Sequence, residues 1–321
     1  MVIVSPAAGD ANNGNARTAQ RWHGLLAAHA GVRIVQQWPD GPQAGRDEVM
    51  LALHARRSAA SIRAWAQQRP SRPLVVVLTG TDLYQDIAFD ADARHSLEAA
   101  HRLVVLQELG IAALPQALRA KARVVLQSTR ALPPVAKPAG TLEAVMVGHL
   151  RAAKAPQVLF DAVRRITPEE GIRVTHIGAD DLDPALGDAA RATASDCPHY
   201  RWLGAVPYED TRERIRRAHV LVHTSALEGG AHVVMEAVRS GTPVLASRVP
   251  GNVGMLGEGY PGCFEPGDAA GLATMLRECR ATQSSPQGLL AQLALACEGR
   301  APLFAPEREQ AALLALLREL A

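Results

Sequence analysis

Short apolar runs, rich in β-branched residues, alternate with stretches of helical periodicity along most of the chain. In the first half, six runs are apolar almost without interruption, as strands buried on both faces of a parallel sheet should be. These runs are MVIVSP, VRIVQQW, EVMLALH, PLVVVLTG, RLVVLQE and ARVVLQS. The predicted helices lie between them, at about Ala16–Ala30, Arg56–Gln68, Ala91–Ala100 and Leu114–Ala120. This alternation predicts a doubly wound α/β domain with a parallel sheet.

A segment rich in proline and glycine, ALPPVAKPAG at 131–140, interrupts the pattern and is typical of a linker. The alternation then resumes with EAVMVG, RVTHIG, HYRWLG, HVLVHTS, TPVLAS and GCFEPG. We therefore predict two Rossmann-like domains in tandem, 1–135 and 136–300. An amphipathic helix within 301–321 should follow and pack back on the N-terminal domain.

The composition fits a globular protein of two domains, with 321 residues, 48% hydrophobic and 21% charged. The formal net charge of +2 gives no electrostatic reason to expect nucleic-acid or membrane binding. The N-terminal residues lack a signal-peptide pattern and no apolar run is long enough for a membrane helix, so we expect a cytoplasmic protein. The four cysteines lack C-x-x-C spacing, which argues against a zinc site or a disulfide framework.

Ligands of open parallel sheets bind beyond the carboxyl ends of the strands, so the residues after each strand are the candidates. The first strand leads into a loop rich in glycine and asparagine that ends at Gly14 and Asn15. Asn15 is expected to cap the following helix and Gly31 to end it. Arg17 and Arg21 would share a face near the positive end of this helix, where an anion could bind. The alternative is a solvated surface helix.

Other polar residues follow the third and fourth strands. His54 and Arg57 come after the third strand, and Thr79 and Asp82 after the fourth. His54 could instead be structural, and Asp82 could cap the next segment rather than contact a ligand. Together these groups suit a small, polar, anionic ligand. Neutral polar groups after the fifth and sixth strands are Gln107, Gln127 and Ser128.

In the second half, Gly148 turns the chain after a strand, and Arg151 and Lys154 precede a helix that starts near Pro156. Backbone amides, helix dipole and two cations at one place could hold a phosphate. The alternative is that both cations are merely solvated.

The segment LEGGAHVVMEAV carries two acids, Glu228 and Glu236. Even in one continuous helix, eight residues would separate them by about 12 Å along the axis. That exceeds the roughly 5–9.5 Å between the carboxylates of a glycosidase pair. The better interpretation is that the two acids contact separate parts of one long ligand. Gly229 and Gly230 would let the backbone approach, amides at Ala231 and His232 would hold a phosphate, and Glu236 would bind paired hydroxyls.

Three motifs of the second half resemble the retaining GT-B glycosyltransferases of family 4. EGGAHVVMEAVRSGTPV resembles their E-x7-E signature, VGHLRAAK their V-G-R-L-x-x-x-K motif, and WLGAVPYEDTRERIRRAHVLVHTS, which includes Val206, their preceding strand–helix–strand. The resemblance implies a GT-B fold, with two Rossmann-like domains facing across a cleft. It also implies that Glu236 holds the ribose of a nucleotide-sugar, Glu228 contacts the donor sugar and Lys154 cradles the diphosphate. The chain departs from the family at His149, where arginine is usual, and at Gly230, which replaces an aromatic residue.

Motifs of the first half are similar to those of the selenosugar synthases of selenoneine biosynthesis: SPAAGDANNGNARTAQRW, LHARRSA, VLTGTDLYQDI and VVLQS. This resemblance implies formation of a C–Se bond between selenophosphate and the anomeric carbon of a UDP-sugar, with UDP-N-acetylglucosamine expected and UDP released. The implied acceptor contacts are Asn13, Arg17, Arg21, His54, Arg57, Thr79 and Asp82. The implied donor contacts are Gly14, Asn15, Gly148, Arg151, Lys154, Val206, Glu228, Gly229, Gly230, Ala231, His232 and Glu236, and the implied catalytic residues are Glu228, Lys154, Arg17 and His54.

Selenophosphate is an anionic, soft nucleophile, so it needs orientation and charge screening more than a base. Cations and a helix start would ease the departure of UDP. No D-x-D motif stands where a GT-A enzyme places one, so we expect no metal and no cofactor. Two alternatives stay open: a conventional family-4 glycosyltransferase with an alcohol or lipid acceptor, and a non-catalytic nucleotide-sugar-binding protein. The sequence leaves the preferred sugar, the anomeric outcome, the loss of the phosphoryl group and the oligomeric state undetermined.

Overall fold

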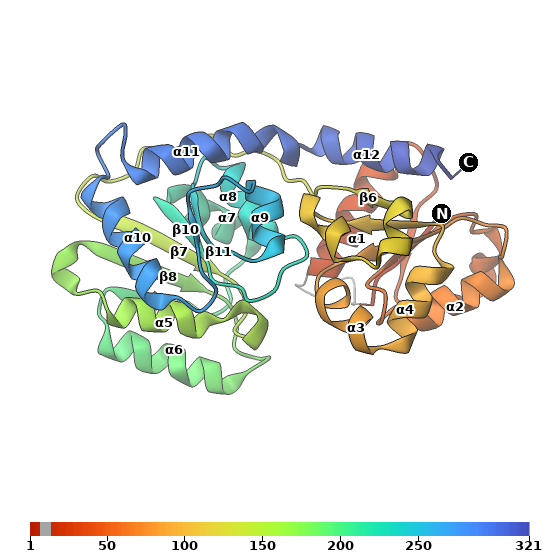
Figure 1. The fold of residues 1–321 in the computed structure, drawn as a ribbon, viewed down its shortest axis with the longest axis horizontal. Coiled ribbons are helices and arrows are strands. Elements are labelled where there is room, and N and C mark those ends of the chain that lie inside the picture. The colour runs from red at the N-terminus through yellow and green to blue at the C-terminus, as the bar shows by residue number, and fades with distance from the viewer. Residues whose placement is uncertain (7–13, 321) are drawn as a thin grey trace. The chain divides into compact units, whose positions relative to one another are not determined.

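The computed structural model describes residues 1–6 and 14–320, and contacts within the chain group it into two compact units (Figure 1). The first unit contains Met1–Ser128, Glu228–Gly230 and Phe304–Ala321. The second contains Thr129–Leu227 and Ala231–Leu303. The C-terminal helix therefore groups with the first sheet, and the chain passes from one unit to the other near residue 128 rather than 135.

Six parallel strands form the sheet of the first unit, in the order β2-β1-β3-β4-β5-β6. They are β1 (Val2–Val4), β2 (Arg33–Val35), β3 (Met50–Leu53), β4 (Leu74–Leu78), β5 (Arg102–Val105) and β6 (Ala122–Val124). Each corresponds to one of the six apolar runs, so the predicted doubly wound sheet is confirmed. The strand order reverses between β1 and β3, and the loops after these two strands therefore flank the switch point of the sheet.

Helices cover both faces of this sheet. They are α1 (Gly14–Leu26), α2 (Ala59–Gln68), α3 (Ile87–Phe89), α4 (Ala91–Ala99) and α12 (Pro306–Arg318). Shorter turns are the 3-10 helices Pro42–Arg46, Glu108–Ala113 and Gln116–Lys121 and the π-helix Asp82–Asp86. Alternate strand residues enter two apolar clusters, one around Trp38 and Trp65 and one that joins Trp22 of α1 to Leu313 of α12. Burial on both faces explains why the strands lack polar alternation.

Three local expectations for this unit are wrong. The first helix already includes Asn15, so this residue is not its N-cap, and the helix ends at Leu26, several residues before Gly31. The helix expected at Leu114–Ala120 is a 3-10 helix that begins after Pro115. Proline fixes its own φ and disfavours helical backbone in the residue before it, which leaves room only for a short turn here.

The second unit contains another six-stranded parallel sheet, in the order β12-β11-β10-β7-β8-β9. Its strands are β7 (Leu142–Val147), β8 (Ile172–Ile177), β9 (Tyr200–Trp202), β10 (Val220–His223), β11 (Val244–Ser247) and β12 (Cys263–Phe264). Its helices are α5 (Pro156–Arg164), α6 (Pro184–Asp196), α7 (Tyr208–Arg217), α8 (His232–Val238), α9 (Pro250–Leu256), α10 (Ala269–Ala281) and α11 (Leu289–Arg300), with 3-10 turns at Ala152–Lys154, Pro168–Glu170 and Ala301–Phe304. The switch point lies between β7 and β10, so the loops after these strands flank it.

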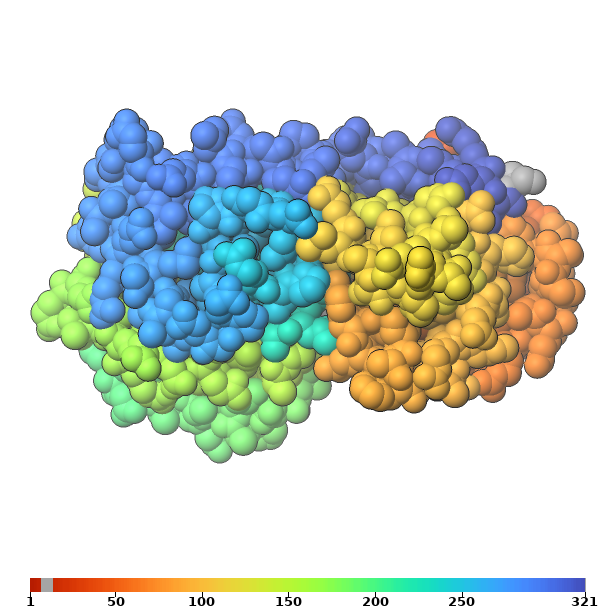
Figure 2. Space-filling model, in the orientation of Figure 1, coloured from red at the N-terminus to blue at the C-terminus, as the bar shows by residue number. Residues whose placement is uncertain are grey.

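Figure 2 shows the surface of α12, in dark blue, beside the yellow atoms of the segment that contains β6. Glu319, which follows α12, pairs with Arg123 of β6 at 2.7 Å.

Among the described residues, no helix is both long and apolar enough to cross a membrane. In the same residues, no three His, Cys, Asp or Glu side chains gather in a way that would hold a metal ion.

The four cysteines are free and buried, at Cys197, Cys263, Cys279 and Cys297. Burial raises the pKa of Cys279 to about 12 and that of Cys297 to about 11. Since the thiolate is the reactive form, these two thiols are inert members of the core.

We expect His176 of β8 to make stability depend on pH. Its ring is fully buried, with Nδ1 2.9 Å from the Tyr200 hydroxyl, and burial lowers its pKa from 6.5 to about 4, partly offset by the Gly148 carbonyl. Between these two values the unfolded state binds more protons than the folded state. The free energy of unfolding should therefore fall as pH drops through this window, by up to about 3 kcal/mol from this group. Urea unfolding across the window should give a shallower pH slope for His176→Asn. Equal slopes in the two proteins would contradict this expectation.

Candidate functional site

Lys154 is fixed at the switch point of the second sheet. It ends the 3-10 turn Ala152–Lys154 in the loop after β7 and is half-buried. A Cβ on Gly148 would lie 3.5 Å from Lys154 Cγ and Cδ, so the lysine stem packs directly over this glycine. The Lys154 carbonyl accepts a hydrogen bond from Thr224 Oγ1 (2.8 Å), and the Ala226 N–H donates to the Ala153 carbonyl (3.0 Å). The loops after β7 and β10 are thereby tied together around the lysine.

The turn at Gly148 is itself held by the end of β8. A Cβ on Gly178 would lie only 1.8 Å from the Gly148 carbonyl oxygen, so only glycine permits this approach. The Ala179 N–H donates to His149 Nδ1 at 3.3 Å. His149, which stands where the family motif usually has arginine, is thus bonded to the loop after β8. Lys154 therefore packs over one of two glycines that follow the adjacent strands β7 and β8 and approach each other closely.

Arg151 and Lys154 lie at the two ends of the turn that precedes α5. Arg151 has extended backbone and an exposed side chain, whereas Ala155, between Lys154 and Pro156, is left-handed with φ 44°. The two cations are thus one short turn before the helix start rather than in its first turn. Their predicted roles at a phosphate stay predictions.

The segment LEGGAHVVMEAV leads into α8, which begins at His232 and has Ala231 as its N-cap. The Ala231 N–H lies 3.1 Å from the sulfur of Met255 and donates to it, so this amide is engaged within the protein. That differs from its expected use on a phosphate. Glu236 lies on the buried side of α8, with 2% of its surface exposed. Val206 is half-buried before α7, and its carbonyl accepts from Thr211 Oγ1.

The other acid of the motif groups with the first unit. Glu228 is 9% exposed, and Gly229 and Gly230 follow it in the same unit, whereas Ala231 belongs to the second. The boundary between the two units thus passes through the E-x7-E segment itself.

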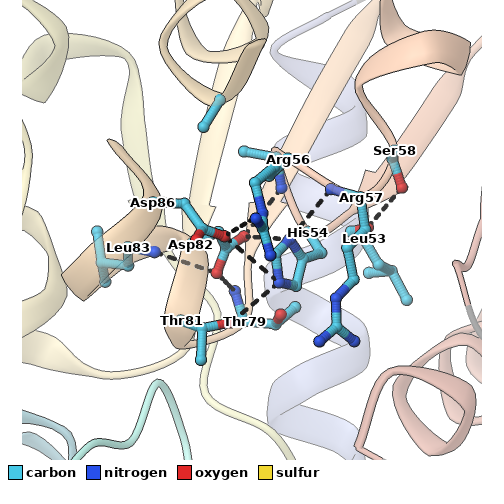
Figure 3. A network of polar contacts seen from close by, with 12 residues as sticks. Leu53, His54, Arg56, Arg57, Ser58, Thr79, Thr81, Asp82, Leu83 and Asp86 are labelled. Atoms are coloured by element: carbon cyan, nitrogen blue, oxygen red, sulfur yellow. Dashed lines mark hydrogen bonds and ion pairs between the residues drawn. The ribbon is translucent and has the colours of Figure 1, made fainter. Parts of the chain in front are cut away.

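His54 forms the centre of a polar network at the carboxyl ends of β3 and β4 (Figure 3). It follows β3 with left-handed backbone, φ 71°, which is uncommon for a residue other than glycine. The ring is buried, with Nε2 3.0 Å from Thr81 Oγ1 and Nδ1 3.8 Å from Asp82 Oδ2. Burial lowers the pKa of His54, and the nearby Asp82 carboxylate opposes that shift. Burial thus favours the neutral imidazole, and the ring is held beside Thr81 and the two acids.

Two residues of this network, Asp86 and Arg56, were not among the candidates from the sequence. The carboxylate of Asp86 lies 3.9 Å from His54 Nε2 and 3.1 Å from Arg56 Nε. Asp82 and Asp86 are four residues apart within a π-helix, so the D-x-x-x-D spacing of DLYQD was the available signal. In Figure 3 the exposed Arg57 guanidinium points away from these two acids. Arg57 is thus the cation of the network that is directed outward.

Asp82 organises the loop after β4 and does not reach solvent. Its side chain is fully buried and accepts backbone N–H bonds from Thr79 (2.8 Å), Gly80 (2.9 Å) and Leu83 (3.1 Å) on Oδ1. A fourth bond, from the Ala55 N–H to Oδ2 (2.9 Å), joins this loop to the one after β3. The structure thus matches the alternative in which Asp82 is structural, rather than a direct contact with a ligand.

We expect Asp82→Asn to destabilise the protein by about 2 kcal/mol. The amide oxygen could accept the three N–H bonds now made to Oδ1, but the NH2 group would then face the Ala55 N–H, and two donors would meet. The pKa of His54 should also fall further, since the carboxylate that raises it is gone. Urea unfolding and histidine NMR titration would measure these effects. Asp92→Asn is the control, because Asp92 is exposed and should change stability by less than about 0.5 kcal/mol. Equal stabilities for the two variants would contradict the loop-organising role.

The first helix carries the remaining acceptor candidates. Gly14 and Asn15 are its first two residues, Arg17 is half-buried in its first turn, and Asn13 lies outside the described residues. Arg21 was expected to be an acceptor cation, but its Nε donates to Glu309 at 2.8 Å. Glu309 comes from α12, 288 residues later, and no local signal in the sequence connects the two. Arg21 is thus an ion-pair partner within the first unit.

The second half of the chain is similar in sequence to known glycosyltransferases. Residues 128–286 match the family model described as glycosyl transferases group 1. A D-inositol 3-phosphate glycosyltransferase of Corynebacterium glutamicum is 33% identical over 150 residues, which cover 43% of this chain and 36% of that protein. The chain thus spans about a third of the length of the relatives it matches.

Solved structures resemble the whole chain. Sucrose-phosphate synthase from Thermosynechococcus elongatus superimposes with a TM-score of 0.77 at 18% identity, over 99% of this chain and 98% of that one. HepE of Anabaena in complex with UDP-glucose gives 0.75 at 16% identity, over 99% of each chain. The chain therefore has the GT-B fold, and its segment 128–286 matches the group 1 glycosyl transferases in sequence.

Proposed function

We propose that the protein transfers a glycosyl group from a UDP-sugar. The observation that carries this proposal is Lys154, fixed by Gly148 and Thr224 at the switch point of the sheet that lies within the matched segment. A cation held there can neutralise the diphosphate as negative charge develops on the leaving group. The similar HepE structure holds UDP-glucose, which supports a uridine nucleotide as the donor.

We further propose that the acceptor is selenophosphate and the donor UDP-N-acetylglucosamine. Selenium would attack the anomeric carbon, the bond from that carbon to the UDP oxygen would break, and UDP would leave with the electron pair. Arg17 and Arg57 would screen the acceptor charge, His54 would contact the acceptor, and Glu228 would contact the donor sugar. Because Lys154 and Arg151 supply positive charge for the diphosphate, we propose that no metal is needed.

Incubation of the purified protein with UDP-N-acetylglucosamine and selenophosphate tests this proposal. We expect equal amounts of UDP and of a selenium-containing sugar, the latter identified by its selenium isotope pattern in mass spectra. EDTA should leave the rate unchanged, and Lys154→Ala should abolish most of it. UDP release without selenium in the sugar would refute the selenophosphate acceptor but not glycosyl transfer.

A second candidate acceptor is an alcohol that carries a phosphate. The corynebacterial relatives are named D-inositol 3-phosphate glycosyltransferases, and the cations at Arg17 and Arg57 could serve such an anion equally. Replacing selenophosphate with inositol 3-phosphate in the same assay separates the two. Tight binding of the UDP-sugar with no turnover on either acceptor would instead indicate a nucleotide-sugar-binding protein.

A further inference from the structure

The C-terminal helix inserts one acid into the core of the first unit. Glu309 of α12 is 1% exposed, and its carboxylate accepts four hydrogen bonds. Oε1 accepts from Trp22 Nε1 (2.7 Å), and Oε2 accepts from Arg21 Nε (2.8 Å). Ser128 donates to Oε2 with both its N–H (2.8 Å) and its hydroxyl (2.5 Å). One carboxylate thus joins α12, α1 and the end of the chain segment after β6.

Docking of α12 does not by itself require this charge. Leu313 and Leu316 of α12 are buried in the cluster around Trp22 and supply apolar contact with the sheet. Burying a carboxylate costs several kcal/mol unless its partners are placed well, and apolar residues of similar size often stabilise as much. The acid therefore contributes orientation: it fixes two consecutive side chains of α1, a cation and an indole, at set positions.

A second set of hydrogen bonds fixes the start of α1. Gln127 Nε2 donates to Thr18 Oγ1 at 2.7 Å, and Thr18 Oγ1 donates to the Gly14 carbonyl at 2.8 Å. Arg17 directly precedes Thr18 and lies one turn before Arg21. Both sets of hydrogen bonds therefore fix the part of α1 that carries Arg17.

Building on the proposed function, we propose that Glu309 is a positioning residue for the acceptor site. It neutralises Arg21 and locks the third turn of α1, so that Arg17, one turn earlier, is presented to the acceptor anion in one orientation. The C-terminal helix thereby completes a site that begins at the first strand of the chain.

Glu309→Gln keeps the volume and the bond to Trp22 but removes the charge that holds Arg21. We expect the KM for selenophosphate to rise about tenfold, with kcat and the UDP dissociation constant within about twofold of wild type. Glu309→Asp, which retains the charge, should recover part of the loss, and Glu307→Gln, exposed in the first turn of α12, should behave as wild type. A purely structural role predicts a lower Tm and a smaller active fraction, so that kcat falls while KM stays constant. That result would overturn the proposal.

A binding measurement separates this proposal from the proposed function. Inorganic phosphate is titrated calorimetrically into the UDP-saturated wild type, Glu309→Gln and Arg17→Ala. Weaker binding in both variants supports the positioning role even if the wild type makes no selenosugar, an outcome that refutes only the proposed acceptor. Equal affinity in wild type and Glu309→Gln, or no phosphate binding by wild type, would refute the positioning role.

Discussion

Replacing Gly178 with alanine should lower kcat/KM for the UDP-sugar by about 100-fold. The new methyl group would stand 1.8 Å from the Gly148 carbonyl oxygen, so the turn after β7 must move by about 1.5 Å to restore ordinary contact. Lys154 packs directly over Gly148 and would move with it. A displacement of about 1 Å at a charged group that contacts a reacting centre can cost about 100-fold in rate.

The loss should appear as weaker UDP binding, measured by calorimetry, with a Tm decrease that corresponds to about 1–3 kcal/mol of overpacking. Gly259→Ala is the matched control, because a Cβ at Gly259 meets nothing within 4 Å and its φ lies outside the left-handed region. Gly148→Ala tests the same geometry more gently, since its Cβ would make only ordinary contact with the lysine stem at 3.5 Å. If Gly178→Ala folds and binds UDP as wild type does, Lys154 does not depend on this glycine pair.

The fold was predictable because its main signal is local. Ile3 of β1 faces the cluster that contains Trp22, whereas its neighbours Val2 and Val4 face the cluster around Trp38. A strand that is buried on both faces has an uninterrupted apolar run, and such a run can be recognised without knowing which strands pair with it. Helix ends were less predictable, as Asn15 shows, because a capping residue is common in loops as well as at caps.

The acceptor side was less predictable because its contacts are distant in sequence. Arg21 and Asp82 belong to the expected residue types, yet Glu309 pairs with one and four backbone amides surround the other. Nothing near Arg21 in the chain indicates its partner, and the burial of Asp82 follows from how two loops meet. The donor motifs are more compact, and Lys154 lies over Gly148 of the same loop.

Glu236→Gln and Glu228→Gln should affect different kinetic constants. Glu236 lies on the buried side of α8, and the proposed role of its carboxylate is to accept hydrogen bonds from the two ribose hydroxyls of the donor. Charged hydrogen bonds of this kind contribute about 1.5–3 kcal/mol, so the amide should weaken UDP binding by roughly 10–100-fold. The proposed contact of Glu228 is instead with the sugar near the bond that breaks, where removal of the charge should lower kcat by about 100-fold or more and leave UDP affinity unchanged.

Calorimetry with UDP and steady-state kinetics with the UDP-sugar distinguish these outcomes. Glu258→Gln, an exposed acid of the second unit, is the control and should match wild type in both measurements. Equal losses of UDP affinity in the two motif variants would mean that both acids hold the nucleotide. Unchanged affinity in Glu236→Gln would show that the buried acid of α8 serves the packing of the helix, and the ribose would then need another partner.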